Sequence, residues 1–189
     1  MHAQFRNFLV SCLLTLPFAQ ALADDYTDTI DVFRKSGESS QFFAKSYGYA
    51  VLPTIGKGGF VFGGAYGTGR VYAKGQYVGD TSMTQVTVGF QLGGQAYSQI
   101  IFFENQRAFD EFTSGNFEFG AQATAVAITA GASAQAGTTG PSATASGTQH
   151  AAKTAAKYYK GMAVFTIAKG GLMYEASIGG QKFEYSPRK

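Results

Sequence analysis

Hydrophobic and polar residues alternate through most of residues 49–103, and short glycine-rich stretches interrupt the alternation. Successive side chains of a β-strand point to opposite faces of the sheet, so a period of two predicts strands. The alternation is cleanest in residues 85–92, where Gln85, Thr87, Gly89 and Gln91 share one face and the other carries Val86, Val88, Phe90 and Leu92. This half of the chain is therefore expected to form a sheet.

The segment from Tyr49 to Gly69 contains most of the glycines that define this pattern. We expect a strand that ends at Pro53, followed by a turn that places one cation among glycines at Gly56, Lys57, Gly58 and Gly59. Consecutive glycine amides can form an anion-binding concavity. A second strand, with Phe60, Phe62 and Tyr66 on one face, should end at another turn over residues 67–69.

Three short helices are predicted around this sheet. The first covers Asp24–Lys35, with acidic residues in its first half and Arg34 and Lys35 at its end, as the helix dipole favours. The second follows Ser39 and carries Phe42, Phe43 and Tyr47. Asn105 is suited to cap the third, which Gly115 should close.

Further strands are expected at residues 70–74, 77–78, 96–103, 162–168, 172–178 and 182–185. Residues 117–130 are apolar but small, so a strand is favoured there and a buried helix is the alternative. Residues 131–152 contain mainly Ala, Gly, Ser and Thr and have little to bury, so we expect a low-complexity loop there. Many short strands with glycine turns predict an α+β fold that is mainly β. Its antiparallel sheet should curl into a sandwich or a barrel-like form, with short N-terminal helices and one internal helix.

The N-terminus has the pattern of a signal peptide. Arg6 provides the positive charge, residues 8–18 are apolar, and Ala21-Leu22-Ala23 forms a small-residue cleavage site. We expect residues 1–23 to be removed and residues 24–189 to form a single domain. This predicts a secreted, periplasmic protein that is soluble or lies peripherally on a membrane of the cell envelope.

Composition excludes several classes of function. The chain has 15 basic and 12 acidic residues, a balance too even to suggest nucleic-acid binding. Its one cysteine lies in the signal segment, and His150 would be the only histidine after cleavage. A Cys-His arrangement and a zinc site therefore lack the residues they need, and a Ser-His-Asp arrangement would depend on His150, which lies inside the low-complexity segment. We expect no enzyme activity, no cofactor and no metal.

The order of several motifs resembles the SYLF lipid-binding family. They include Gly48-Tyr49-Ala50-Val51, Pro53, Ile55-Gly56-Lys57-Gly58-Gly59, Gly63-Gly64-Ala65-Tyr66-Gly67, residues 91–95, residues 100–104, Gly115-Asn116-Phe117 and residues 119–123. The resemblance covers nearly all of residues 36–180. It implies an exported bacterial member of a family whose eukaryotic relatives bind phosphoinositides and, in some cases, actin. Residues 132–152 depart from the pattern. We do not extend actin binding to an exported chain.

The resemblance implies a non-enzymatic module that binds anionic phospholipid or a membrane surface. Lys57 and the neighbouring glycines Gly56, Gly58 and Gly59 are the first candidates for contact with the headgroup. Arg70 and Lys74 share a predicted strand face with Tyr72, and Lys153, Lys157 and Lys160 would line one side of a helix. The alternative for each of these sets is an ordinary solvated surface, and for the strand and helix sets that alternative is favoured.

Aromatic contact with acyl chains is a further hypothesis for Phe33, Phe42 and Phe43 in the first two helices. The alternative function is that of a structural or interaction protein of the cell envelope without lipid specificity. Sequence patterns do not identify the lipid or the oligomeric state.

Overall fold

The computed structural model describes residues 18–59, 62–88, 95–121, 123–128, 157–169 and 178–189. The helices are α1 (Phe18–Lys35), α2 (Gly37–Ser40), α3 (Phe42–Lys45) and α4 (Gln106–Phe112). The strands are β1 (Gly48–Gly59), β2 (Phe62–Ala73), β3 (Gln76–Val88), β4 (Gln95–Phe103), β5 (Phe117–Glu118), β6 (Val126–Ile128), β7 (Met162–Lys169) and β8 (Lys182–Pro187).

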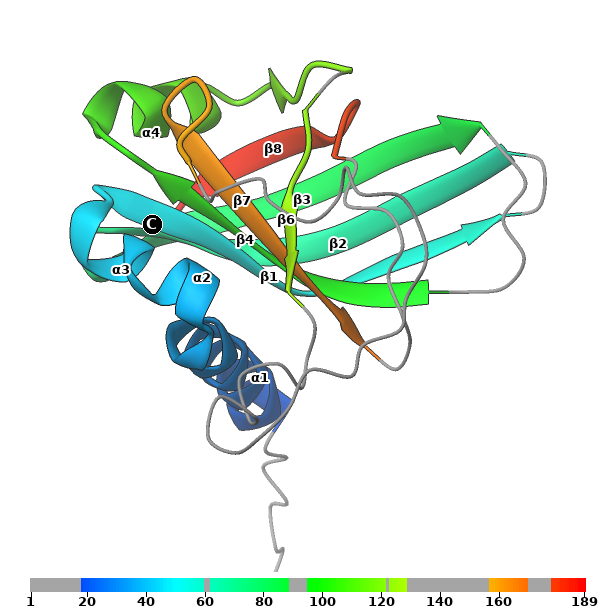
Figure 1. Ribbon diagram of the computed structural model, residues 1–189. Helices are drawn as coiled ribbons and strands as arrows, with labels where there is room; N and C mark the ends of the chain where they lie inside the picture. Colours follow the sequence, from blue (N-terminus) through cyan, green and yellow to red (C-terminus); the bar gives the residue numbers. More distant parts are fainter. Residues whose placement is uncertain (1–17, 60–61, 89–94, 122, 129–156, 170–177) are drawn as a thin grey trace, which may run out of the picture.

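The described strands form one curled sheet in the order β5-β8-β3-β2-β1-β4-β7-β6. All neighbouring strands are antiparallel except β6 and β7, which are parallel. The sheet forms a half-barrel (Figure 1). The predicted mainly-β α+β fold is confirmed, with the correction that the sheet is mixed because β6 returns to the outer edge of β7 in the same direction.

The sheet buries apolar side chains on both faces. The hollow of the half-barrel holds one cluster, which includes Leu52, Met83, Phe103, Phe112 and Phe183. The outer face packs under α1 and α3 through a second cluster, which includes Phe33, Phe42, Phe102 and Phe165. Helices α1, α2 and α3 lie together on one side of the sheet in Figure 1, while α4 lies at its upper end.

Two predicted turns are wrong. Strand β1 continues through Pro53 to Gly59, so Gly56, Lys57, Gly58 and Gly59 lie in a strand. The amide-lined concavity expected there is absent from this described strand, because paired strand amides are used in the ladder with β2 and β4. A register irregularity between Val51 and Thr54 accommodates the proline.

The second wrong turn is at residues 67–69, which lie inside β2. Gly67 and Gly69 face the hollow, where a β-carbon on Gly69 would lie 2.6 Å from the Val51 carbonyl oxygen and 2.8 Å from Leu52 Cγ. These glycines permit a close approach between strands at the curl of the sheet and do not reverse the chain.

In β3 a polar side chain is buried and its apolar neighbour is exposed, which is the opposite of the usual pattern. Gln85 is buried in the hollow and its Nε2 donates to the Gly179 carbonyl at 2.9 Å, whereas Val86 is 81% exposed on the outer face. The predicted strand over residues 117–130 is also shorter than expected. Only β5 and β6 form there among the described residues, and between them the Ala123 amide donates to the Gly120 carbonyl oxygen at 2.9 Å, which is the bond of a turn and not of a strand ladder.

The helix predictions agree with the structure in type, but the predicted second helix is divided into two. Ser39 is not a cap, because it lies inside α2 and its hydroxyl donates to the Phe33 carbonyl oxygen at 2.6 Å, while α3 carries Phe42 and Phe43 and ends before Tyr47.

Asn105 caps α4, since its Oδ1 accepts from the Ala108 amide at 3.1 Å, and Gly115 follows with a φ of 109°. Helix α1 begins at Phe18, six positions before the predicted start, and runs across the predicted cleavage site. The low-complexity segment and residues 172–177 of the strand predicted at 172–178 lie outside the described residues, and Ile178, which is described, is not in a strand.

Candidate functional site

Residues 157–162 enter β7 through a two-residue hairpin turn. Tyr159 and Met162 exchange backbone hydrogen bonds of 2.8 and 3.0 Å, and Lys160 and Gly161 between them have φ values of 53° and 82°. Positive φ at both central residues is the pattern of a type I′ turn. The predicted helix carrying Lys157 and Lys160 on one side is therefore wrong from residue 157 onward, and Lys153 lies outside the described residues.

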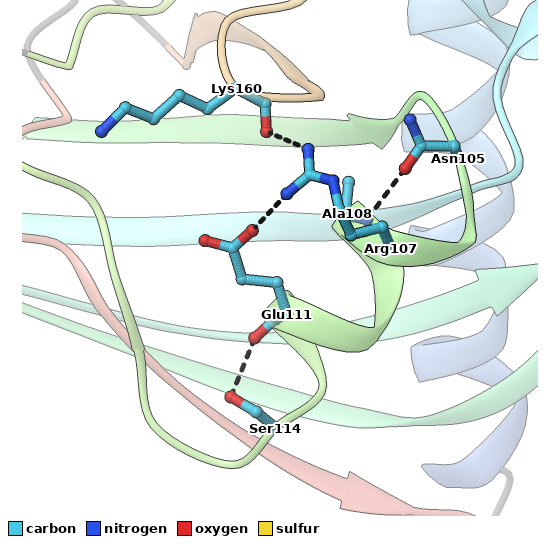
Figure 2. A network of polar contacts seen from close by, with 6 residues as sticks. All are labelled: Asn105, Arg107, Ala108, Glu111, Ser114 and Lys160. Atoms are coloured by element: carbon cyan, nitrogen blue, oxygen red, sulfur yellow. Dashed lines mark hydrogen bonds and ion pairs between the residues drawn. The ribbon is translucent and has the colours of Figure 1, made fainter.

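Helix α4 holds this turn in place. Arg107 donates to the Lys160 carbonyl oxygen at 3.4 Å and pairs with Glu111 at 3.1 Å, one turn along the helix. Figure 2 shows the Lys160 side chain extending away from Arg107. The backbone at Lys160 is thus tied to the domain while its ammonium group projects freely from the turn.

Two neighbouring hollows open beside this turn, with volumes of about 420 and 320 Å³. They share four lining residues, Phe119, Ala123, Tyr159 and Met162, and we call the combined feature the groove. Most of its surface is apolar. The remaining members of the larger hollow are Thr124, Ala125, Val126, Lys157, Tyr158, Ala163, Val164, Phe165 and Ile178, and those of the smaller are Glu111, Phe117, Glu118, Gly120, Ala121 and Lys160.

The back of the groove is fixed by Tyr158. Its hydroxyl lies 2.7 Å from Ser46 Oγ at the end of α3, and its ring meets Phe42 edge-on at 5.1 Å. Burial raises the pKa of Tyr158, the Ser46 hydrogen bond lowers it, and the Glu104 charge raises it. Tyr158 is therefore a neutral wall at physiological pH.

The ionic groups around the groove are unevenly paired. Glu111 pairs with Arg107, and Glu118 lies 3.7 Å from Lys182 Nζ. Lys157 and Lys160 are exposed, and neither has an ion pair with the described residues. The Lys160 ammonium lies 5.7 Å from the ring centroid of Tyr159, which is itself 68% exposed. The free charge at the groove is thus positive.

This arrangement suits a ligand with an apolar part and an anionic part. Apolar walls favour a hydrocarbon chain because contact removes both surfaces from water. Two unpaired ammonium groups at the mouth would attract phosphate oxygens. The sequence does not predict the walls of the groove. Residues 119–126 have the pattern of a strand of small residues, and their contact with residues 157–162 is a tertiary contact that leaves no local signal.

The structure separates the other predicted site residues from the groove. Lys57 is half-buried in β1, opposite Ala65 of β2 and Gln95 of β4. Gly56 and Gly58 face the exposed side of that strand. A lipid contact at Lys57 remains a prediction, but neighbouring glycine amides are not its partners.

Arg70 and Lys74 do not form the expected common face. Arg70 lies in β2 with its guanidinium against the rings of Tyr26 and Tyr77, at 4.2 and 5.1 Å from their centroids. Lys74 lies beyond the end of β2 in a turn, with a φ of 50°, and its ammonium is 5.4 Å from the Tyr47 centroid. Because Lys74 lies in the turn, its side chain does not follow the two-residue alternation that would place it on the same strand face as Arg70.

The hypothesis that helix aromatics contact acyl chains is wrong for two of its three residues. Phe33 and Phe42 are buried between the helices and the sheet. Phe43 is half-buried against Tyr49 and Phe102, with Arg34 over its ring. These side chains hold the helices to the outer face.

Within the described part of the chain, no helix is long and apolar enough to cross a membrane. The same residues contain no group of three His, Cys, Asp or Glu side chains placed to hold a metal ion.

The chain matches a known protein family. The family model described as "Ysc84: Las17-binding protein actin regulator" matches residues 84–186, which is more than half of the chain. The match runs from the exposed end of β3 through α4, the groove and β8, and it confirms the SYLF resemblance. No curated protein matches the chain.

Proposed function

Because this chain belongs to the Ysc84 (SYLF) family, we propose that it is a non-enzymatic binding protein that takes an anionic phospholipid into the groove. The observation that carries the proposal is the pairing of an apolar hollow with two unpaired lysines at its mouth. An acyl chain would lie against Phe119, Met162 and Val164. The phosphate would meet Lys157 and Lys160.

The expected free energies indicate that the lysines and the apolar walls are both needed for binding. A lysine near an anionic surface contributes about 1 kcal/mol, so two give about 2 kcal/mol, which alone is weak and sensitive to salt. Burying hydrocarbon contributes about 0.8 kcal/mol per methylene group. A few methylene groups in the groove would therefore match the contribution of both lysines, and only the two together give stable attachment.

The test is co-sedimentation of the protein with phosphatidylcholine vesicles and with vesicles containing phosphatidylglycerol, at low and high salt. The double variant Lys157→Gln/Lys160→Asn should bind the anionic vesicles roughly thirtyfold less tightly at low salt, which corresponds to about 2 kcal/mol. Asparagine tolerates positive φ, so it preserves the turn at residue 160. Binding that is unchanged in this variant would refute the proposal.

Two single variants sharpen the result. Lys74 occupies the first central position of a matching Lys-Gly turn between β2 and β3, with φ values of 50° and 79° for Lys74 and Gly75. Lys74→Asn should leave binding unchanged if the groove is the site, and an equal loss would show general attraction of the sheet end to anions. Lys35→Gln, on the exposed side of α1, controls for total charge.

Export is part of the same proposal. Helix α1 crosses the predicted cleavage site, and among its described side chains Asp25, Tyr26, Ile30 and Phe33 contact the sheet. Removing residues 1–23 would keep all four. The proposal predicts that the protein isolated from the periplasm begins at Asp24, and an intact N-terminus on that protein would refute cleavage.

One observation favours the alternative role in envelope structure. On the outer face, Tyr66 is 59% exposed and Val86 is 81% exposed, and the exposed positions beside them are Gly56, Gly64 and Thr84. An uncharged face of this kind suits contact with another protein. Light scattering would reveal a stable oligomer, and Val86→Lys should dissociate it without changing vesicle binding.

A further inference from the structure

A third hollow of about 430 Å³ lies on the outer face of the sheet, where α1 meets β2, β3 and β8. Its lining includes Tyr26, Thr68, Arg70, Asp80, Glu184 and Ser186. It shares no residue with the groove. We call this hollow the tyrosine pocket, because tyrosine side chains fix its charged groups.

Arg70 and Asp80 are directly opposite each other on β2 and β3, so their β-carbons are about 4.5–5.5 Å apart on the same face. Opposite charges in this position usually pair, yet no ion pair joins these two described residues within 4.0 Å. The absence of an ion pair between Arg70 and Asp80 requires a physical explanation.

Tyr77 and Tyr26 provide that cause. The Arg70 guanidinium is held between the Tyr26 and Tyr77 rings, at 4.2 and 5.1 Å from their centroids. The Tyr77 hydroxyl donates to Asp80 Oδ1 at 2.7 Å. Each charge is thus fixed by a tyrosine, and stacking leaves the guanidinium edge, with its hydrogen-bond donors, available to another group.

Further charges complete the pocket. Asp80 lies opposite Ser186 on β8, and Glu184 lies opposite Ser82. Arg188 stacks on Tyr77 at 4.9 Å and is fixed by its amide, which donates to the Val78 carbonyl at 2.9 Å. Arg70 and the two carboxylates line the hollow itself, and Arg188 lies outside this lining, against Tyr77. A simple anion would meet the carboxylates, and a simple cation would meet Arg70.

We propose that the tyrosine pocket binds a zwitterion that carries a phosphate group and a primary ammonium group, as phosphoethanolamine does. The Arg70 fork matches phosphate oxygens, and the Asp80 and Glu184 carboxylates accept hydrogen bonds from the ammonium N–H groups. A quaternary ammonium has no N–H to donate, so phosphocholine would bind less well. The ligand could be a free phosphoethanolamine compound or the headgroup of a lipid.

The experiment titrates the protein calorimetrically with phosphoethanolamine, phosphocholine, inorganic phosphate and ethanolamine. Phosphoethanolamine should bind at least tenfold more tightly than each of the other three. Equal affinity for inorganic phosphate would overturn the proposal in favour of a plain anion site. Equal affinity for phosphocholine would overturn the role of the carboxylates.

A second experiment, with vesicles, distinguishes a free phosphoethanolamine compound from the headgroup of a lipid. Vesicles of phosphatidylcholine with and without phosphatidylethanolamine are compared, both without anionic lipid. Stronger binding to the vesicles with phosphatidylethanolamine supports the lipid headgroup, whereas binding of the soluble compound alone supports a free ligand. Absence of binding in both arms overturns the proposal. The Lys157→Gln/Lys160→Asn variant should behave as wild type here, so failure of groove binding and failure of pocket binding are distinguishable.

Variants locate the site. Arg70→Gln and Asp80→Asn should each lower phosphoethanolamine affinity at least fivefold. Arg34→Gln is the matched control, because Arg34 also stacks on a ring, that of Phe43 at 5.1 Å, but lies outside the pocket. Asp110→Asn on α4 controls for the lost carboxylate. Thermal unfolding verifies that the variants fold, and undiminished affinity in folded Arg70→Gln would overturn the assignment.

Discussion

Gln99 and Gln181 exchange two side-chain hydrogen bonds inside the hollow of the half-barrel. Nε2 of Gln99 donates to Oε1 of Gln181 at 2.9 Å, and Nε2 of Gln181 donates back at 3.2 Å. Both side chains are fully buried. Gln181 Nε2 also donates to the Tyr97 hydroxyl at 3.1 Å. This amide pair joins β4 to the chain just before β8, two segments that lie far apart along the sheet.

Replacing both glutamines should cost less free energy of unfolding than the two single replacements added together. Gln181→Leu leaves the buried Gln99 amide without a partner, which should lower the free energy of unfolding by about 1–3 kcal/mol. The double variant Gln99→Leu/Gln181→Leu removes donors and acceptors together, so its loss should be smaller than the sum of the single losses. Urea denaturation of the four proteins measures this coupling. Additive losses would show that the amides act independently.

Stability should fall at alkaline pH through Tyr97. Burial raises the pKa of Tyr97 from 10.0 to about 12, while its hydrogen bond with Gln181 lowers it. The folded state therefore keeps a proton that the unfolded state loses above pH 10, and folding becomes less favourable as pH rises from 10 to 12. At pH 11 this group should cost about 1.3 kcal/mol relative to pH 9. Tyr97→Phe should show a correspondingly smaller decrease between these two pH values in urea denaturation.

Gly69 and Gly56 should respond oppositely to alanine. A β-carbon at Gly69 would meet the Val51 carbonyl oxygen and Leu52, so Gly69→Ala should lower the free energy of unfolding by about 1–3 kcal/mol. At Gly56 no atom lies within 4 Å of the added carbon, and alanine should stabilise by up to about 1 kcal/mol. Thermal unfolding of the two variants and the wild type measures these changes in stability. Equal effects would mean that close approach does not explain the glycine in β2.

Arg107 should influence lipid binding through the turn that it supports. Arg107→Leu removes the bond to the Lys160 carbonyl (Figure 2), and we expect anionic vesicle affinity to fall severalfold. The stability change should stay below about 1 kcal/mol because the Arg107–Glu111 pair is exposed. Co-sedimentation at moderate and high salt measures the affinity.

The matched control is Glu111→Gln, which removes the ion pair and leaves the Arg107–Lys160 bond in place. Binding should then remain near wild type. If Glu111→Gln reduced binding as much as Arg107→Leu, the ion pair and not the support of the turn would be responsible.

Local signals made much of the fold predictable. Asn105 marked the start of α4, because an asparagine oxygen suits an exposed helix amide, and the apolar run before it marked β4. The candidate site was only partly predictable. Lys157 and Lys160 were identified as candidates for phosphate contact, but their helix was wrong, since the tight turn at Lys160 and Gly161 depends on pairing between Tyr159 and Met162.

Local patterns in the sequence specify the type of most elements, since periodicity, caps and glycines act within a few residues. Which face of a strand is buried depends on contacts between segments that are distant in the sequence. Val86 is exposed and Gln85 is buried because the hollow offers Gln85 a carbonyl partner at Gly179, a residue 94 positions away. The groove and the tyrosine pocket arise in the same way. Their walls come from distant segments, and a contact between distant segments leaves no periodic signal in either one.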